Sequence, residues 1–342
     1  MTITPWRATC IQMKGGLVGN AASRVAAWSI INRNLDRAIT AIEEVCAGNH
    51  KPKLVVLPEF GFQGAPQDLS PADWIERACT PIPGAISEPL QHVAEQRRIY
   101  IAAHQFESDP DWPGRFFNSC FLIDPRGKVI LRYRRINTAL WPSPHDMMDA
   151  YVARYGIEGV FPVVSTELGR LVMMPCGELS VPEVARVFMM RGAEVILHPN
   201  NAQSSPGMEA AKIARAAENM VYVVSANIAG GIGTSRDGSL LGGRSQIVDF
   251  LGESLAYDPE PHETNAVSAL IDIEALRAAR ASAGLGNALM RCRFEMYRPF
   301  FAKAAFYPPN SFLDRPMQDE ADLERPAALA LRNLKEAGIV GG

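Results

Sequence analysis

The sequence lacks the long apolar stretches of membrane proteins and the charge excess of nucleic-acid-binding proteins. No apolar run approaches the ~20 residues that a membrane helix requires. Lysine and arginine total 34 against 37 acidic residues, for a formal net charge of -3, so no basic field favours nucleic acid. The first residues also lack the charged-then-apolar order of a secretory signal. We therefore expect no nucleic-acid partner and no membrane insertion.

Cysteine and histidine are scattered singly along the chain. The six cysteines form no Cys-x-x-Cys pair and the six histidines show no ligand spacing, which argues against a disulfide framework and a zinc site. The cysteines are Cys10, Cys46, Cys79, Cys120, Cys176 and Cys292. We expect a reducing, cytoplasmic setting, where a single cysteine is either buried in the core or a working thiol.

Short apolar runs alternate with amphipathic segments along most of the 342 residues. Hydrophobic residues make up 47% of the chain and charged residues 21%, which is enough apolar material for a large core. Buried strands are expected at Ala8–Gln12, Leu54–Leu57, Tyr100–Ala103, Cys120–Ile123, Leu171–Met174, Val195–Leu197, Val221–Asn227, Arg244–Asp249 and Ala266–Ile271. Helices are expected at Arg24–Cys46, Ile86–Gln96, Val181–Arg191 and Met208–Met220. This alternation predicts a layered α/β sheet.

The composition of the chain changes near residue 275. No linker or short repeat precedes this point, and an Arg-rich segment followed by aromatic and Pro-rich segments comes after it. We therefore expect residues 1–274 to form the main domain. Residues 275–342 are expected to be an extension that packs on the core or on a neighbouring subunit.

Cys176 is the cysteine whose surroundings favour chemistry. It follows the apolar run 171–175 and precedes Gly177, and a helix is expected to begin near Pro182. At such a strand-to-helix turn, backbone N–H groups and the helix dipole lower a thiol pKa and stabilise an oxyanion. A glycine there also lets a substrate approach the backbone. From this spacing alone, a nucleophile and a buried structural cysteine both remain open.

Two more charged groups are expected at the same sheet edge, because parallel strands end together. Glu59 directly follows the apolar run 53–58, where apolar neighbours raise the pKa of a carboxyl toward that of a general base. Arg135 lies in a cationic cluster at the end of the run 127–134, where a cation stabilises an oxyanion. For Glu59 or Arg135 considered alone, a solvated side chain at a strand end remains an alternative.

Together these segments resemble the nitrilase superfamily of carbon–nitrogen hydrolases. The matching stretches, which span residues 5–272, are LVVLPEFGF, GKVILRYRRIN, PCGE with VPEVARVFMMRGAEVILHPN, ARAAENMVYVVSANIAG and GGRSQIVDFLGE. The resemblance implies a four-layer α-β-β-α sandwich that pairs into homodimers or larger homo-oligomers, without a metal or organic cofactor. It also implies a Glu–Lys–Cys triad, with Glu59 as general base, Cys176 as nucleophile and the Gly177 N–H in the oxyanion hole.

The sequence departs from the family pattern at the lysine. Arg135 stands where the second residue of an Arg-Lys pair is expected, and the nearest lysine, Lys128, lies seven residues earlier. Arginine still offers fixed N–H donors to an oxyanion, but a pKa above ~12 prevents it from handing a proton to the leaving nitrogen. Its planar head also requires a differently shaped pocket.

A second glutamate, which many members carry before the cysteine, is also missing. The segment after Trp141, where some members have it, contains none. His145, Asp146 and Asp149 remain open as its replacement. We favour His145, because imidazole holds or transfers a proton near neutral pH.

Two residues near the cysteine are candidates for substrate contact. Glu178 is close enough in sequence to meet either the substrate or a positive side chain. Asn200 follows the run 195–197 and is a candidate for reading a polar group of the substrate, because this loop borders the pocket in relatives.

These residues predict a thiol hydrolase that cleaves a carbon–nitrogen bond of a small molecule, an amide in preference to a nitrile or carbamoyl group. Glu59 would deprotonate Cys176, and Arg135 with the Gly177 N–H would meet the oxyanion. Two alternatives stay open. One is a binding or regulatory protein without turnover, motivated by the missing lysine. The other is an acyltransferase that passes the same thioester to an amine.

Overall fold

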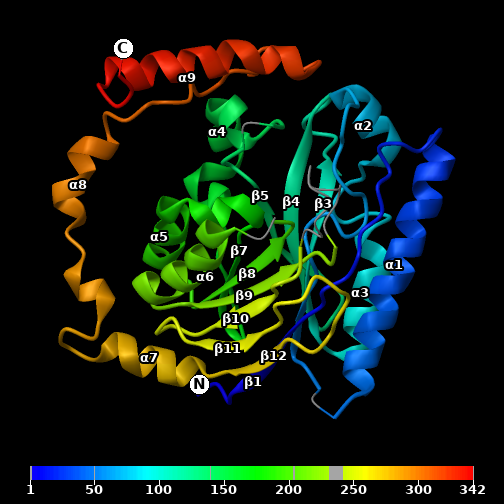
Figure 1. Ribbon diagram of the computed structural model, residues 1–342, viewed down its shortest axis with the longest axis vertical. Coiled ribbons are helices and arrows are strands. Elements are labelled where there is room, and N and C mark those ends of the chain that lie inside the picture. The colour runs from blue at the N-terminus through cyan, green and yellow to red at the C-terminus, as the bar shows by residue number, and fades with distance from the viewer. Residues whose placement is uncertain (1, 50, 139, 203–204, 231–241, 342) are drawn as a thin grey trace.

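The computed structural model describes residues 2–49, 51–138, 140–202, 205–230 and 242–341, which form two six-stranded sheets (Figure 1). The first sheet has the order β12-β1-β2-β3-β4-β5. Its strands are β1 (Trp6–Cys10), β2 (Leu54–Val56), β3 (Tyr100–Ser108), β4 (Phe116–Ile123), β5 (Val129–Arg134) and β12 (Ser268–Ile271). The second sheet has the order β11-β10-β9-β8-β7-β6. Its strands are β6 (Val164–Thr166), β7 (Gly169–Met173), β8 (Val195–Asn200), β9 (Tyr222–Asn227), β10 (Gln246–Val248) and β11 (Ser254–Tyr257).

Helices cover the outer face of each sheet and complete four layers (Figure 1). The first sheet carries α1 (Arg24–Ala47), α2 (Pro71–Ala78) and α3 (Ser87–Arg97), and the second carries α5 (Pro182–Met190) and α6 (Pro206–Asn219). The predicted α-β-β-α sandwich is therefore confirmed. Within the described ranges, no helix is both long and apolar enough to span a lipid bilayer.

The sequence pattern of each element decides which face it buries. In β2, Leu54 and Val56 pack between the sheets, whereas Val55 packs in the cluster under α1, as the period-two alternation of a strand requires. The α1 helix begins after Ser23, whose side chain accepts a hydrogen bond from the Ala26 N–H at 3.2 Å. Its buried side, spaced at three and four residues, consists of Ala27, Ile31, Asn34, Leu35, Ala38 and Ile42.

The third strand is longer than its apolar run indicates. Tyr100–Ala103 is the apolar part, but β3 continues to Ser108 and pairs with β4 over its whole length after Tyr100. His104, Gln105 and Glu107 are buried in this continuation, and each has hydrogen-bond partners. Polar residues therefore extend the strand into the interior because each forms hydrogen bonds there.

The C-terminal extension leaves the core and then returns to it. The helix α7 (Ile273–Ala281) runs across the expected boundary at 274, and its Ile273 and Leu276 are buried. After η3 (Ala288–Arg291), the helix α8 (Phe294–Phe301) has no buried residue and stands away from the sandwich (Figure 1). The chain then packs back through the buried Phe312 and Met317. It ends with η4 (Glu320–Leu323) and α9 (Glu324–Glu336).

Candidate active site

Glu59, Arg135 and Cys176 meet at one end of the sandwich, between the two sheets. Glu59 follows β2, Arg135 follows β5 and Cys176 follows β7. In each sheet the central strands are parallel, β1-β2-β3 in one and β7-β8-β9 in the other. The segments that follow these strands therefore emerge at common edges, which is where open α/β sheets place their ligands.

The two carboxylate oxygens of Glu59 have different surroundings. Glu59 is fully buried. Its Oε1 accepts a hydrogen bond from Asn118 Nδ2 at 2.9 Å and lies 3.6 Å from Arg135 Nη1. Its Oε2 is buried without a hydrogen-bond partner among the described residues. Burial raises the pKa of Glu59, and Arg135 and the Asn118 N–H oppose this effect. One oxygen is thus held in place while the other is available as a base.

Cys176 stands on a turn with unusual backbone geometry. Its φ of 44° lies in the left-handed region that residues with a side chain rarely adopt. The following residues form the short helix η2 (Cys176–Ser180). Burial, with the nearby Glu59 as the second cause, raises the pKa of the thiol to about 12. The thiol is therefore protonated at neutral pH, and it needs a base to become a nucleophile.

The carbonyl of Cys176 is held by a histidine from the next strand. His198 Nε2 lies 3.0 Å from the Cys176 oxygen, and His198 Nδ1 lies 2.8 Å from Ser225 Oγ. A carbonyl only accepts, so Nε2 carries the proton and Nδ1 accepts from the serine hydroxyl. Burial lowers the pKa of His198 to about 3. His198 is therefore a neutral support for the strained turn.

Arg135 is fixed beside both Glu59 and Gly177. Its Nε donates to the Asn137 carbonyl at 3.1 Å, and its Nη1 faces Glu59. A Cβ added to Gly177 would lie 3.1 Å from Arg135 Nη2. The glycine at 177 therefore makes room for the guanidinium, in addition to any role for its N–H.

Glu178 ties the cysteine turn to the segment after β5. Its Oε1 accepts hydrogen bonds at 3.0 Å from the N–H groups of Ile136 and Asn137 and from the Asn137 side chain. Glu178 is fully buried, and burial raises its pKa. These bonds favour a role in positioning Arg135 against Cys176 over direct contact with a substrate.

Asn200 lies at the end of β8 with an unpaired amide. The residue is 1% exposed, and neither Oδ1 nor Nδ2 has a hydrogen-bond partner among the described residues. The neighbouring Asn201 directs its backbone N–H at Cys176, which lowers the thiol pKa. A buried amide left without partners is destabilising unless a ligand pairs with it.

The structure does not bring His145 into this cluster. His145 lies in η1 (Pro144–Met147), where its ring packs on Tyr307 of the extension with centroids 6.0 Å apart. Its carbonyl accepts from Asn310 N at 3.0 Å. Among the described residues, no hydrogen bond or ion pair joins His145 to Glu59, Arg135 or Cys176. Asp146 forms a capping box with Ser143 instead.

The sequence reasoning missed Asn118 and His104. Asn118 lies inside β4 and His104 inside β3, and both are 1% exposed. The available signal was the presence of a polar residue within an otherwise apolar strand, because buried polar groups need partners. The hydrogen-bond partners of such a residue lie on other strands, so the sequence alone does not identify them.

Comparisons with known proteins identify the family. The carbon-nitrogen hydrolase family model matches residues 7–281. An (R)-stereoselective amidase from Pseudomonas sp is 30% identical over 252 residues, covering 72% of this chain and 82% of that amidase. A formamidase from Bacillus cereus is 28% identical over 263 residues, covering 75% of this chain and 73% of that formamidase. The chain therefore belongs to the carbon–nitrogen hydrolase family, and it is an enzyme of the amidase and nitrilase type.

The fold is shared with solved structures of the nitrilase superfamily. The amidase from Nesterenkonia sp. AN1 superposes with a TM-score of 0.61 at 19% identity, covering 86% of this chain and 96% of that amidase. In one such structure the acetamide moiety of fluoroacetamide is added covalently to the active-site cysteine of that amidase.

Proposed function

We propose that the protein hydrolyses a small amide through an acyl-enzyme on Cys176. The observation that carries this proposal is the buried contact between Glu59 and Arg135, at 3.6 Å, beside the thiol of Cys176. The covalent adduct on the cysteine of the Nesterenkonia amidase supports Cys176 as the nucleophile. A nitrile or a carbamoyl group is the less favoured substrate.

The first half of the reaction forms a thioester and releases the amine. Glu59 Oε2 takes the thiol proton as sulfur attacks the amide carbon, and the carbonyl oxygen becomes an oxyanion beside Arg135 and the Gly177 N–H. When the C–N bond breaks, the proton on Glu59 moves to the leaving nitrogen, and ammonia or an amine departs. Arg135 keeps its proton throughout, so Glu59 acts as both base and acid.

The second half returns the enzyme to its starting state. Glu59 takes a proton from water, the hydroxyl oxygen attacks the thioester carbon, and the second oxyanion is held by the same donors. The C–S bond then breaks, the carboxylic acid leaves, and the proton on Glu59 returns to the sulfur. Transfer to an amine in place of water would follow the same path, because the thioester is common to both.

Asn200 favours an amide over a nitrile. In a buried position, its side chain offers one acceptor and one donor group that have no partner in the described part of the chain. A primary amide carries N–H donors that can pair with Oδ1, whereas a nitrile nitrogen carries none. The amidase and formamidase relatives agree with this preference.

The test is to trap the acyl-enzyme. The protein is mixed with small primary amides and nitriles, ammonia is assayed, and the intact mass and the Cys176 peptide are measured after acid quenching. We expect ammonia from amides and an acyl mass on Cys176, and neither from Cys176→Ala. Ammonia release that persists in Cys176→Ala, or an adduct only on another cysteine, would overturn the proposal.

We also propose that the enzyme works as a homodimer or larger homo-oligomer in the cytoplasm. The helix α8 has no buried residue, and its exposed side chains include Phe294, Met296, Tyr297, Phe300 and Phe301. Such an aromatic surface is typical of a protein interface. All six cysteines are free, which agrees with a reducing compartment.

A further inference from the structure

A closed ring of hydrogen bonds includes Glu59. The Phe60 N–H donates to His104 Nδ1 at 3.3 Å. His104 Nε2 lies 3.0 Å from Asn118 Oδ1, and Asn118 Nδ2 donates to Glu59 Oε1 at 2.9 Å. Because Glu59 and Phe60 are consecutive residues, the ring closes through the backbone. It joins the end of β2 to β3 and β4.

The direction of every bond in this ring is determined. A backbone N–H can only donate, so His104 Nδ1 must be the acceptor and Nε2 must carry the proton. The Nε2 proton then points at Asn118 Oδ1, which places the amide nitrogen of Asn118 toward Glu59. Burial lowers the pKa of His104 to about 3, so the imidazole stays neutral and keeps this tautomer across the working pH range.

The ring also supports a strained backbone. Phe60 has a φ of 60°, in the left-handed region that is unfavourable for a residue with a Cβ. The N–H of Phe60 is the group that donates to His104 Nδ1. Glu59 is therefore followed by a strained residue that His104 holds. In the same way, His198 supports the strained Cys176, whose φ is 44°.

We propose that His104 and Asn118 are positioning residues that give the two oxygens of Glu59 separate tasks. Asn118 holds Oε1, the oxygen that faces Arg135, and this leaves Oε2 to accept the thiol proton. Without the ring, the carboxylate can turn about its last torsion and present either oxygen to Arg135. This proposal rests on the proposed role of Glu59 as the base.

The groups that set the ionisation of Glu59 come from three segments. Arg135 faces it from the end of β5, Asn118 from β4, and the thiol of Cys176 and the carboxyl of Glu178 from the turn after β7. His104 adds no charge. Of these, Arg135, the Asn118 amide and the Cys176 thiol favour the ionised carboxylate, so loss of the Asn118 N–H makes Glu59 harder to ionise.

The test measures the reactivity of Cys176 toward iodoacetamide as a function of pH, together with kcat and KM for a primary amide. The key variant is Asn118→Asp, which keeps the shape and the acceptor for His104 but replaces the donor to Glu59 by a carboxylate. We expect the acid limb of Cys176 alkylation to move up by about one pH unit or more. We expect kcat to fall on the order of tenfold to a hundredfold with KM nearly unchanged.

A pair of substitutions at 104 separates positioning from simple packing. His104→Gln keeps a donor near the Nε2 position, whereas His104→Leu removes both nitrogens. We expect kcat to fall less in His104→Gln than in His104→Leu, in both cases with KM nearly unchanged. The surface control His92→Gln, whose ring bonds only to Gln96 in an exposed position, should match the parent enzyme.

The proposal is overturned if Asn118→Asp and His104→Leu lower the melting temperature but leave kcat and the acid limb of alkylation at the parent values. Alkylation needs no amide turnover, so it remains informative if the protein releases no ammonia from any amide. In that case the proposed function fails while the shift in alkylation still decides the role of the ring.

Discussion

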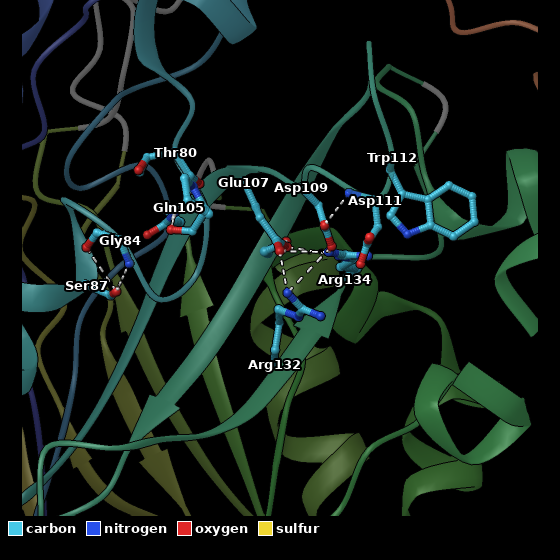
Figure 2. A network of polar contacts seen from close by, with 12 residues as sticks. Thr80, Gly84, Ser87, Gln105, Glu107, Asp109, Asp111, Trp112, Arg132 and Arg134 are labelled. Carbon is cyan, nitrogen blue, oxygen red and sulfur yellow. Dashed lines mark hydrogen bonds and ion pairs between the residues drawn. The ribbon is translucent and has the colours of Figure 1, made fainter. Parts of the chain in front are cut away.

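Arg134 reaches across β4 to hold Glu107 of β3 with two parallel hydrogen bonds (Figure 2). The distances are 2.9 Å from Nε to Oε2 and 2.7 Å from Nη2 to Oε1. The guanidinium also binds Asp109 and stacks 4.1 Å over the Phe117 ring. Because side chains alternate along a strand, Arg135 points to the opposite face, toward Glu59. The first arginine of the pair anchors the strand, and the second faces Glu59.

Removing the charge of Glu107 should destabilise the protein. Arg134 has a side chain only 1% exposed, and a buried guanidinium that loses one of its two carboxylate partners is costly. We expect Glu107→Gln to lower the free energy of unfolding by about 3 kcal/mol, measured by urea denaturation. The control Arg126→Gln removes an exposed arginine from Asp124, whose carboxylate keeps its bonds to the N–H groups of residues 126 and 128, and should change the free energy of unfolding by less than about 1 kcal/mol. Equal effects in the two variants would contradict a structural role for the Arg134 network.

Lysine should not replace arginine at 135. Arg135 Nε is bound to the Asn137 carbonyl while its Nη atoms lie beside Glu59 and Gly177, and one ammonium cannot occupy these positions together. We expect Arg135→Lys to lower kcat/KM for a primary amide about 100- to 1000-fold through kcat. The exposed Arg126→Lys serves as the control. A gain in activity would show that arginine hinders turnover and that the pocket is not built around it.

Activity should disappear on the acid side at a pH above 4.5, the ordinary value for a glutamate. Burial raises the pKa of Glu59, so the carboxyl takes up its proton at a higher pH than usual and then cannot accept one from Cys176. The thiol pKa of about 12 means that no free thiolate appears near neutrality. A kcat/KM profile and the alkylation rate should share this acid limb, and Glu59→Gln should abolish it. If activity and alkylation rose only near the pKa of the thiol, Glu59 would not be the base.

The substitution Asn200→Leu should separate stability from activity. An apolar side chain of similar size removes an unpaired buried amide, so we expect the melting temperature to stay the same or rise. The substrate amide loses its partner, so kcat/KM should fall about 10- to 100-fold. Asn219→Leu is the matched control, because Asn219 is buried with its Nδ2 bonded to the Arg215 carbonyl. Asn219→Leu should lower the melting temperature and leave KM unchanged. If Asn200→Leu instead lowered the melting temperature and left kcat/KM unchanged, Asn200 would not contact the substrate.

The aromatic residues of α8 should contribute to self-association. Phe300 is 79% exposed and Phe301 58% exposed within one chain. We expect sedimentation velocity to show a dimer or larger species, and Phe300→Ser/Phe301→Ser to shift it toward the monomer. Val25→Ser, which removes a 78% exposed side chain on α1, should leave the distribution unchanged. A monomeric parent protein at all concentrations would contradict the proposal.

Much of the fold followed from local patterns. The period of α1 and the alternation in β2 place their apolar residues on the buried faces as predicted. The short strands β6 and β11 were missed, because neither contains a fully buried residue. The boundary expected between residues 274 and 275 falls inside α7. The residue Leu276, just after that boundary, is buried in the core. The composition change near residue 275 did not mark an element boundary, because it falls inside α7 (Ile273–Ala281).

The sequence by itself determined a layered α/β fold and the placing of Glu59, Arg135 and Cys176 at strand ends, because strand period and strand-end chemistry depend on neighbouring residues; the four-layer sandwich was implied by the family resemblance. The tertiary structure decided which groups orient them. Asn118 lies 59 residues from Glu59, and Glu178 lies 42 residues from Ile136. Hydrogen bonds of this kind depend on strand order and register, which bring distant residues together. The paired arginines therefore acquire different tasks only when β5 takes its place beside β4.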